Sequence, residues 1–129
     1  MTACPFCTLD ASRILAENPL AVAIADAFPL TPGHTLIVPR RHIASLFEAT
    51  PEEQSALFEI LAEMRERLLD ERKPDGFNIG INDGAAAGQT VMHLHIHLIP
   101  RHKGDSADPR GGVRWIFPDR ARYWNEEKK

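Results

Sequence analysis

The chain has 129 residues, of which 15 are Lys or Arg and 18 are Asp or Glu, so its formal net charge is −3 with neutral histidines. This length predicts one domain whose core needs neither disulfides nor a metal. The near balance of charge argues against general nucleic-acid binding, which requires a basic face. No apolar run approaches the roughly 20 residues of a membrane span, and no basic-then-apolar signal segment opens the chain. We therefore expect a cytoplasmic protein.

The first half of the chain predicts two strands and a short helix. A turn at residues 4–7, Cys-Pro-Phe-Cys, comes first. Residues 20–26 form a strand-like run that its alanines weaken, and the breaker-rich residues 28–33 predict a loop. Residues 34–38 predict a short buried strand that the following proline ends. A small helix is expected over residues 43–49.

The clearest helix begins after Thr50. Thr50 is a favourable N-cap, Pro51 stands at the first helical position, and Glu53 completes a capping box. The segment 73–76, Lys-Pro-Asp-Gly, predicts its end. Apolar residues at helical spacing predict the side that faces the core, Met64 among them. These residues are Leu57, Ile60, Leu61, Met64 and Leu68.

The second half of the chain predicts two further strands. Residues 77–82 alternate apolar with small or polar side chains, and residues 83–88 predict a flexible loop. Residues 93–98 alternate histidine with aliphatic residues, which is the period of a strand. Strands joined by short links favour antiparallel neighbours. We therefore predict an α+β fold, in which helices pack on one face of an antiparallel sheet.

Three histidines in strict alternation are the most informative feature of the chain. Successive side chains of a strand point to opposite faces, so His93, His95 and His97 share one face, about 7 Å apart from one to the next. The aliphatic residues between them line the other face and require a core behind it. Two plain interpretations of the histidines are a metal-chelating strip at the surface and hydrogen-bonded side chains in a polar core.

Histidine also suits phosphorus chemistry. Its ordinary pKa of about 6.5 makes the neutral imidazole abundant at physiological pH, and this form is a good nucleophile. His95 is the best candidate, because one ring nitrogen attacks while the other donates a hydrogen bond that fixes the tautomer. Donors must then meet the negative charge of the α-phosphate. Candidates that need no metal are Asn82, Gln89, Thr90 and His97.

The residues around the histidines resemble the signature of the histidine triad superfamily, in which histidine alternates with apolar residues. Residues 88–91, Gly-Gln-Thr-Val, and residues 100–101, Pro-Arg, match that signature on either side. Residues 32–39 resemble the Pro-Gly-His segment of the same family, and the match extends over about residues 4–104. The resemblance implies a histidine triad fold with about five antiparallel strands and one long and one short helix on one face.

The resemblance also implies one domain over residues 1–129, with a C-terminal extension from about residue 105. The family's middle histidine is its nucleophile, which places that role on His95, and its supporting fourth histidine corresponds to His34. Asp26 matches the position that holds the ribose hydroxyls. Contacts to the α-phosphate fall on Asn82, Gln89, Thr90 and His97. Positions that flank the base, for which ordinary core packing is the alternative, are Phe6, Leu9, Ile24 and Ala27.

The activity that the resemblance implies is a nucleotide hydrolase or nucleotidyl transferase. It would act at the α-phosphate of a purine nucleotide through a covalent nucleotidyl-histidine intermediate and release a nucleoside monophosphate. His97 stands where the branch that transfers nucleotidyl groups between sugars has glutamine, which favours a hydrolase. Residues 100–105 resemble the fragile-histidine-triad branch, which cleaves dinucleoside polyphosphates such as diadenosine tetra- or triphosphate.

Three alternatives stand beside this activity. The first is hydrolysis of nucleoside phosphoramidates, which share the adenosine α-phosphate half and differ in the leaving group. The second is a nucleotide-binding regulator with incidental turnover. The third is a zinc-binding interaction protein in which the histidines form a metal strip. Magnesium, where it helps, would bind the substrate's phosphates.

Cys4 and Cys7 have the spacing of metal ligands, but two thiolates are only half of a tetrahedral zinc site. The context is not that of a redox pair at a strand end, and packing as two small apolar residues is the alternative. Some members of the family carry such a pair with a structural zinc. Their other ligands are a histidine after the Pro-Gly-His strand and the first histidine of the triad. The resemblance thus implies a zinc site of Cys4, Cys7, His42 and His93.

The C-terminal extension is rich in aromatic residues. We expect Trp115 or Trp124 to shape the side of the pocket that sets specificity for the leaving group. Members of the family usually form dimers whose sheets join into one, so the resemblance also implies a homodimer.

Overall fold

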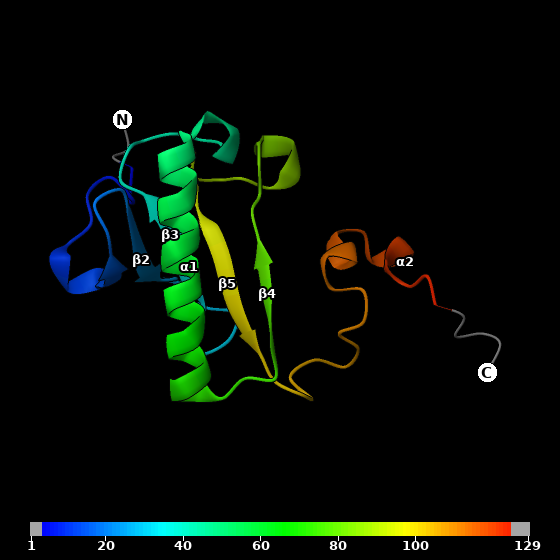
Figure 1. The fold of residues 1–129 in the computed structure, drawn as a ribbon. Coiled ribbons are helices and arrows are strands. Elements are labelled where there is room, and N and C mark those ends of the chain that lie inside the picture. Colours follow the sequence, from blue (N-terminus) through cyan, green and yellow to red (C-terminus); the bar gives the residue numbers. More distant parts are fainter. Residues whose placement is uncertain (1–3, 125–129) are drawn as a thin grey trace.

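The structure, a computed structural model, describes residues 4–124 of the chain (Figure 1). The strands and helices are β1 (Ile14–Glu17), β2 (Ala21–Ala25), β3 (Thr35–Pro39), α1 (Pro51–Arg72), β4 (Gly76–Gly80), β5 (Ile96–Arg101) and α2 (Pro118–Ala121). The strands form one antiparallel sheet in the order β1-β2-β3-β5-β4, and α1 lies across one face of it. The predicted α+β fold is confirmed, including five strands, one long helix and one short helix.

Two elements differ from the sequence-based prediction. The sequence does not predict β1, because this edge strand of four residues is too short to show a pattern of alternation. The helix expected over residues 43–49 is a single 3₁₀ turn, η2 (Leu46–Glu48), which begins at Ser45. The other 3₁₀ turns are η1 (Ala11–Arg13), η3 (Ala85–Ala87) and η4 (Gly112–Ile116).

The histidine strand is also shorter than the alternation predicts, because β5 begins only at Ile96. The ladder with β3 pairs Ile37 with Ile96, so the same register two positions further would bring Pro39 opposite Leu94. Proline has no N–H to donate, and the ladder ends before that point. The N–H of Leu94 donates instead to the carbonyl of Ile43, over 2.7 Å. The first two histidines therefore lie just outside the sheet ladder, His93 at a bend of the chain.

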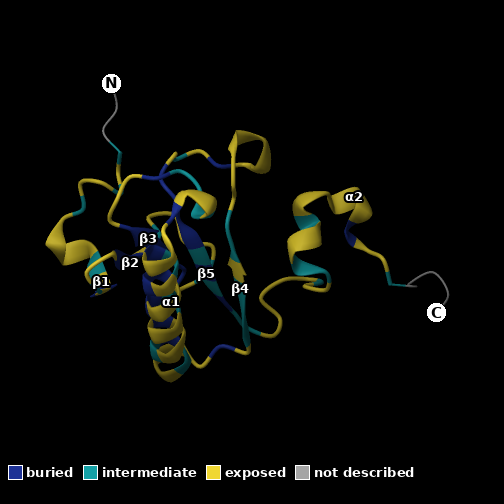
Figure 2. Cartoon of the chain, turned by 45° about the horizontal axis from the view of Figure 1, so that its top comes forward, coloured by how far each residue is buried: buried dark blue, intermediate teal, exposed yellow. Residues whose placement is uncertain are grey.

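The main core lies between α1 and the sheet, where Figure 2 shows the buried residues gathered. The aliphatic residues that alternate with the histidines belong to it, as their spacing predicts, and Met64 is buried there as expected. Within residues 4–124, no helix is long and apolar enough to cross a membrane. The centre of this core is formed by Ile37, Leu57, Ile60, Met64, Leu68, Leu94, Ile96 and Leu98.

The opposite face of the sheet carries the third histidine. Directly paired residues of an antiparallel sheet project to the same side. The pairs Ile24 with Leu36, Leu36 with His97, and His97 with Gly80 therefore define one row across four strands. Gly80 has no side chain, so nothing from β4 covers His97 on that side. The row ends in an apolar cluster toward β2 and in open space toward β4.

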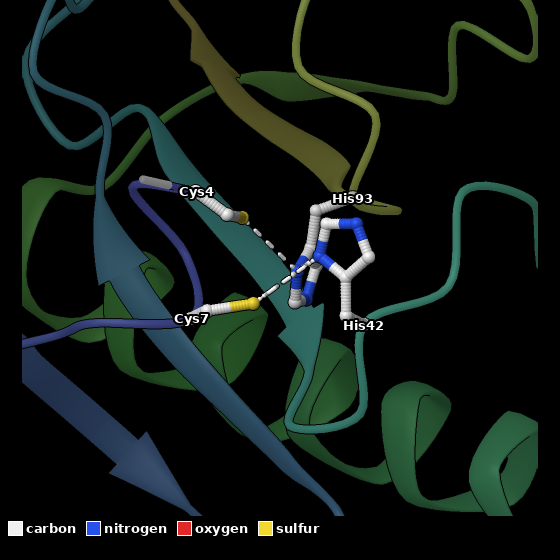
Figure 3. Close-up of side chains that lie close together, drawn as sticks. All are labelled: Cys4, Cys7, His42 and His93. Carbon is white, nitrogen blue, oxygen red and sulfur yellow. Dashed lines mark hydrogen bonds between the residues drawn. The ribbon is translucent and has the colours of Figure 1, made fainter. Parts of the chain in front are cut away.

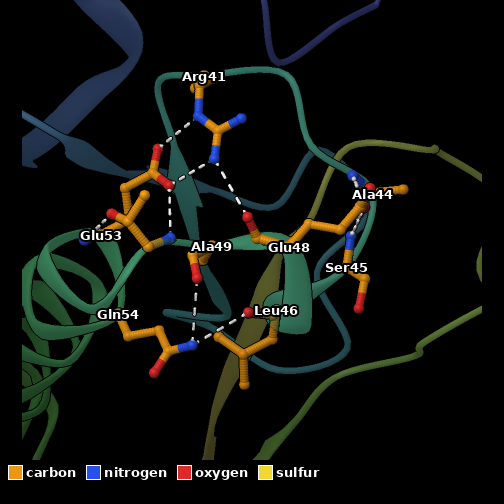
Figure 4. A network of polar contacts seen from close by, with 9 residues as sticks. Arg41, Ala44, Ser45, Leu46, Glu48, Ala49, Glu53 and Gln54 are labelled. Atoms are coloured by element: carbon orange, nitrogen blue, oxygen red, sulfur yellow. Dashed lines mark hydrogen bonds and ion pairs between the residues drawn. The ribbon is translucent and has the colours of Figure 1, made fainter.

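Two capping boxes joined by one arginine fix the segment between β3 and α1 (Figure 4). Thr50 and Glu53 cap α1 as predicted, and Ser45 and Glu48 cap η2 in the same way. The Arg41 guanidinium donates to both carboxylate oxygens of Glu53, over 3.0 and 2.8 Å, and to the carbonyl of Glu48 over 3.2 Å. This network anchors Arg41 to residues 48 and 53 and so fixes the backbone next to His42.

Glu53 is 5 % exposed, and its hydrogen bonds to Arg41 and to the Thr50 backbone hold its pKa down at about 2, against an ordinary 4.5. A carboxyl whose pKa is lower in the folded state adds stability above its unfolded pKa and loses it as the pH falls. We expect Glu53→Gln to lower the free energy of unfolding by about 1–2 kcal/mol at pH 7, a value discounted because Arg41 is exposed. The difference from the wild type should shrink between about pH 4.5 and pH 2. Urea unfolding at pH 7 and pH 3 measures it.

The matched control for this prediction is Glu59→Gln, which removes an exposed glutamate from the middle of α1. Its effect should stay within about 0.5 kcal/mol at both pH values. Equal destabilisation by the two variants, or a Glu53→Gln difference that does not depend on pH, would contradict the assignment.

Candidate functional site

His95 has one ring nitrogen fixed by the backbone and the other unengaged. Its Nδ1 lies 2.9 Å from the carbonyl oxygen of His93, and a carbonyl can only accept, so we assign the proton of the neutral ring to Nδ1. Nε2 then carries a lone pair. The ring lies between Phe6 and His97, each at 5.2 Å between ring centroids. At 9 % exposure the side chain is largely buried yet not sealed.

The third histidine belongs to a hydrogen-bonded chain that begins at a backbone N–H. Leu30 N–H donates to His34 Nδ1 over 3.1 Å, so the proton of neutral His34 is on Nε2. His34 Nε2–H lies 2.9 Å from His97 Nδ1 and donates to it. His97 therefore carries its own proton on Nε2 and can donate it outward. The chain thus sets a donor beside the lone pair of His95.

Burial keeps these imidazoles neutral. It lowers the pKa of His34, which is 3 % exposed, and the Asp26 carboxylate 3.3 Å from His34 Nε2 opposes that shift without reversing it. Burial also lowers the pKa of His97, and the neighbouring His95 and His34 lower it further. Both rings are therefore expected in the neutral form around pH 7, in which each has one donor and one acceptor.

Asp26, His34 and His97 lie close enough together to hold a metal ion. The tautomers argue against it. A metal on His34 Nε2 would require the proton there to move to Nδ1, and the bond from Leu30 N–H would be lost. Asp26 is also occupied, because its Oδ1 accepts from Phe28 N–H over 2.8 Å. We therefore interpret this group as a hydrogen-bonded relay.

The loop before the histidines is organised by a buried side chain. Gln89 Oε1 accepts from Gly84 N–H over 2.8 Å, and its amide nitrogen donates to the carbonyls of Ala44 and Val91 over 2.9 and 3.1 Å. Direct contact of this amide with a phosphate would require one of these bonds to open. Asn82 and Thr90 are both exposed beside the loop and free to turn toward a ligand.

The residues expected to flank the base do not behave alike. Ile24 is fully buried in a second apolar cluster on the histidine face, and Phe6 and Leu9 pack against that cluster. Ala27 is exposed and lies outside it. Ile24 therefore packs inside the apolar cluster. Phe6 lies at its border and contacts the rings of His93 and His95.

Cys4, Cys7, His42 and His93 form a compact group at the end of the histidine row (Figure 3). His93 Nδ1 lies 3.4 Å from Cys4 Sγ and 3.5 Å from Cys7 Sγ. His42 Nδ1 lies 3.2 Å from Cys7 Sγ and 3.2 Å from His93 Nδ1. Zinc–ligand bonds of about 2.0–2.3 Å in a tetrahedron separate ligand atoms by roughly 3.3–3.7 Å, so the donor set fits such an ion.

The surroundings of this group are also those of metal ligands. His93 Nε2–H donates to the carbonyl of Pro39 over 2.8 Å, which leaves the Nδ1 lone pair toward the sulfurs. Partial desolvation raises the pKa of the Cys7 thiol, and the neighbouring Cys4 raises it further. A cation between the two sulfurs would remove this unfavourable interaction. The donor atoms of the four residues that the resemblance implies all lie within 4.8 Å of one another, close enough to hold a metal ion.

The aromatic residues of the tail do not line a pocket. Residues 109–124, which we call the C-terminal unit, lie beyond β4 (Figure 1). Trp115 donates its Nε1–H to the Arg110 carbonyl over 2.8 Å, and the Arg110 guanidinium lies 4.4 Å from the centroid of the Trp124 ring. Val113 and Ile116 instead line an open cavity of about 590 Å³ that reaches His97. Neither Trp115 nor Trp124 lines this cavity, because both pack within the unit, and their expected effect on leaving-group specificity stays a prediction.

Asn82 and His97 of this cavity are predicted from the sequence, whereas Asn78, Gly80, Ile99 and Arg101 are not. The signal was available, because alternation along residues 77–82 places Asn78, Gly80 and Asn82 on one face of β4 and its continuation. The same alternation along β5 places Ile99 and Arg101 beside His97. Which face these residues occupy depends on the register between β4 and β5, and the sequence alone does not supply that register.

Comparisons with known proteins identify the family of this chain. A family model described as the HIT domain matches residues 9–104. Among curated relatives, the protein hit of Bacillus subtilis is 37% identical over 107 residues, which are 79% of this chain and 74% of that protein. An asymmetrical bis(5'-nucleosyl)-tetraphosphatase of Schizosaccharomyces pombe is 36% identical over 97 residues, 75% of this chain and 53% of that protein. An adenylylsulfatase of Arabidopsis thaliana is 35% identical over 106 residues, 79% and 54% of the two chains.

Two solved structures are informative. A protein of Streptococcus mutans superposes with a TM-score of 0.74 at 35% identity, over 84% of this chain and 71% of that one. A zinc-bound histidine triad family protein of Mycobacterium smegmatis gives a TM-score of 0.67 at 35% identity, over 74% of this chain and 69% of that one. With the family match over residues 9–104, these similarities show that the chain belongs to the histidine triad family.

Proposed function

We propose that this chain is a nucleotide hydrolase that acts at the α-phosphate through a covalent intermediate on His95. The observation that carries the proposal is the pair of fixed tautomers. His95 presents a lone pair on Nε2, and the neighbouring His97 presents a proton on Nε2. A nucleophile beside a positioned proton donor is the arrangement that covalent catalysis of group transfer requires.

In the first step, His95 Nε2 attacks the α-phosphorus, and the bond from phosphorus to the leaving group breaks. His97 Nε2–H donates a hydrogen bond to the leaving atom, which departs as the anion of the remaining phosphate chain. The His95 ring becomes positively charged, because Nδ1 keeps its proton, and the His93 carbonyl accepts a stronger hydrogen bond from it. Water then attacks the phosphorus and releases one proton to the solvent, and the phosphorus–nitrogen bond breaks. The products are a nucleoside monophosphate and neutral His95.

The remaining contacts follow the same geometry. His34 is a positioning residue that fixes the tautomer of His97 through a 2.9 Å hydrogen bond. Exposed Asn82 and Thr90, with Gln89 once one of its backbone bonds opens, are the proposed donors to the α-phosphate. Asp26 is proposed to bind the ribose, and the base-flanking residues are Phe6, Leu9, Ile24 and Ala27.

The substrate we favour is a dinucleoside polyphosphate such as diadenosine tetra- or triphosphate. One relative at 36% identity is named as an asymmetrical bis(5'-nucleosyl)-tetraphosphatase, which supports this class. Another, at 35% identity, is named as an adenylylsulfatase, so the family accommodates other leaving groups. A nucleoside phosphoramidate hydrolase is the second candidate, because the fixed tautomers suit a leaving amine equally well. Magnesium is proposed only as an ion on the substrate's phosphates.

We further propose that Cys4, Cys7, His42 and His93 hold a structural zinc ion, for which the zinc-bound relative gives support. Bound zinc would tie the N-terminal turn to the end of the histidine row and so hold Phe6 against His95. Homodimer formation is likewise a proposal. The edge strand β4 supports it, because it carries no charged residue to block pairing with another strand. The cytoplasmic location expected from the sequence remains part of the proposal.

The first test compares the wild type with His95→Ala, using diadenosine tetraphosphate and adenosine phosphoramidate as substrates. We expect AMP release by the wild type and a loss of about a thousandfold or more in kcat/KM for the variant, because the nucleophile is gone. An acid-labile nucleotidyl adduct, detected by mass spectrometry, should map to His95 and be absent from the variant. His102→Ala is the matched control, since His102 lies outside the site and its ring bonds the Arg72 carbonyl.

Turnover that survives in His95→Ala would exclude the covalent route through this residue. Tight AMP binding without turnover of either substrate by the wild type would instead favour the nucleotide-binding regulator.

The second test concerns zinc. We expect about one zinc ion per chain by elemental analysis, and a melting temperature that falls by about 5 °C or more on chelation, because binding energy of a structural ion adds to folding energy. His42→Ala should lose the ion. His95→Ala and His97→Ala should keep it, which distinguishes the tetrahedral site from a metal strip. A zinc content that falls in all three variants would contradict the assignment.

A further inference from the structure

The cavity beside the third histidine extends beyond the residues to which the proposed chemistry gives a role. It lies between the outer strands β4 and β5 and the C-terminal unit, and its volume of about 590 Å³ is that of a small-molecule site. It begins at His97, whose ring centroid is 5.2 Å from that of His95. Phe6 lies at the same distance on another side of His95. The nucleophile thus stands between the apolar cluster and this cavity.

The lining of the cavity is mainly aliphatic. Ile99 projects from β5, and Val113 and Ile116 face it from η4. Val113 and Ile116 remain 65 % and 69 % exposed, although side chains of this kind are usually buried. Leu30, which precedes β3, lies at the rim and is 74 % exposed. These apolar surfaces from three separate segments converge on one space, which favours an occupant with an apolar face.

Asn78 is one of the polar residues of the lining. Asn78 Oδ1 accepts from Arg101 Nη1 over 2.6 Å, which fixes the amide and leaves its NH₂ as a donor. That nitrogen lies beside Gly112, where a Cβ would come within 3.3 Å of it. Glycine with a φ of +44° at this position therefore lets the C-terminal unit approach β4 closely. The occupant is expected to offer Asn78 a hydrogen-bond acceptor.

The charges of the lining cancel. Arg101 donates two hydrogen bonds to Asp105, over 2.8 and 2.7 Å, and these hold the pKa of the Asp105 carboxyl well below its usual range. Among the described residues that line the cavity, these two are the charged ones, so no uncompensated cation is available for an anion. A free phosphate or sulfate would gain little there, because a carboxylate lies beside the guanidinium.

The far wall is held by stacked side chains rather than by the main core. Arg122 lies 5.0 Å from the centroid of the Trp115 ring, and Arg114 lies 4.9 Å from that of Tyr123. Arg114 also donates to the carbonyls of Arg120 and Ala121, over 2.6 and 2.9 Å. Such contacts give a small segment a defined shape. The aromatic residues of the tail thus act behind the wall and not in it.

We propose that this cavity binds the uncharged, aromatic part of the leaving group, such as the second nucleobase of a dinucleoside polyphosphate. The inference rests on the proposed function and makes its substrate class more specific. Val113 and Ile116 contact the face of the ring, and Asn78 donates to a ring nitrogen or carbonyl. The enzyme accordingly selects leaving groups that end in a base or a comparable aromatic group over bare phosphate or sulfate.

The test uses two substrates that differ only in this part, diadenosine tetraphosphate and adenosine 5'-tetraphosphate. The quantity measured is the ratio of their kcat/KM values for AMP release. Ile116→Ala and Val113→Ala should each lower the ratio roughly fivefold or more, since only one substrate reaches the wall. Phe117→Ala is the matched control, because Phe117 is 64 % exposed next to Ile116 but does not line the cavity. Its ratio should match that of the wild type within about twofold.

A second measurement does not depend on turnover. Methyl resonances of Val113 and Ile116 should shift on titration with adenosine and stay in place with inorganic phosphate. A wild type that hydrolyses neither tetraphosphate while its methyl resonances respond to adenosine would overturn the proposed function and retain the cavity as a base-binding site. Methyl resonances that do not respond, or variants that slow both substrates equally, would overturn the inference itself. Equal slowing with an altered elution volume in gel filtration would identify the wall as a subunit contact.

Discussion

Pro39 sets the boundary on which the arrangement of the histidines depends. Without an N–H it cannot extend the ladder between β3 and β5, so residues 93–95 lie outside that ladder. The carbonyl of His93 then accepts the Nδ1–H of His95. The carbonyl of Pro39 accepts the Nε2–H of His93, which turns the other nitrogen of that ring toward the two cysteines. Because Pro39 has no backbone N–H, His93 and His95 make different hydrogen bonds and expose different ring nitrogens.

Burial and hydrogen bonding act together on these rings. A fully buried imidazole is costly to protonate, and burial lowers the pKa of His34, His93 and His97. A neutral ring has one donor and one acceptor, so each backbone partner decides what the opposite nitrogen can do. The Leu30 N–H fixes the tautomer of His34, and His34 in turn fixes that of His97. The Leu30 N–H thus determines that His97 presents a proton on Nε2. Packing that excludes water is therefore part of the chemistry as well as of the stability.

The elements that the sequence predicts well are those with local signals. The capping box at Thr50 and Glu53, the apolar stripe that includes Met64, and the alternation of the histidines each depend on residues within a few positions of one another. Two thiols and two imidazoles from distant segments were assembled from the family resemblance, and the structure brings their donor atoms together. A spacing of two thiolates alone would not have identified His42 as their neighbour.

What the sequence does not predict depends on register and on contacts between segments. β1 is recognisable only as a partner of β2, since its four residues carry no pattern of their own. The side-chain amide of Gln89 could donate to a phosphate. It is instead hydrogen-bonded to the backbone of Gly84, Ala44 and Val91. Trp115 and Trp124 are the conspicuous residues of the tail, yet they pack on arginines. Val113, which nothing in the sequence marks out, lines the cavity instead. The side of the tail that faces β4 is set by the fold of the tail.

The site therefore has two sides under different constraints. Most residues proposed to contact the nucleotidyl half lie within the family match, residues 9–104, on the strands of the sheet or on the segments that adjoin them. The wall of the cavity beyond His97 lies outside that match and depends on a separate unit held by cation–π contacts. A sheet that must keep Leu36, His97 and Gly80 in register tolerates little change. A wall attached beyond an edge strand can change its shape without disturbing that register. The chemistry proposed at His95 thus depends on the part of the chain that the family shares, whereas the selectivity proposed for the leaving group depends on the tail.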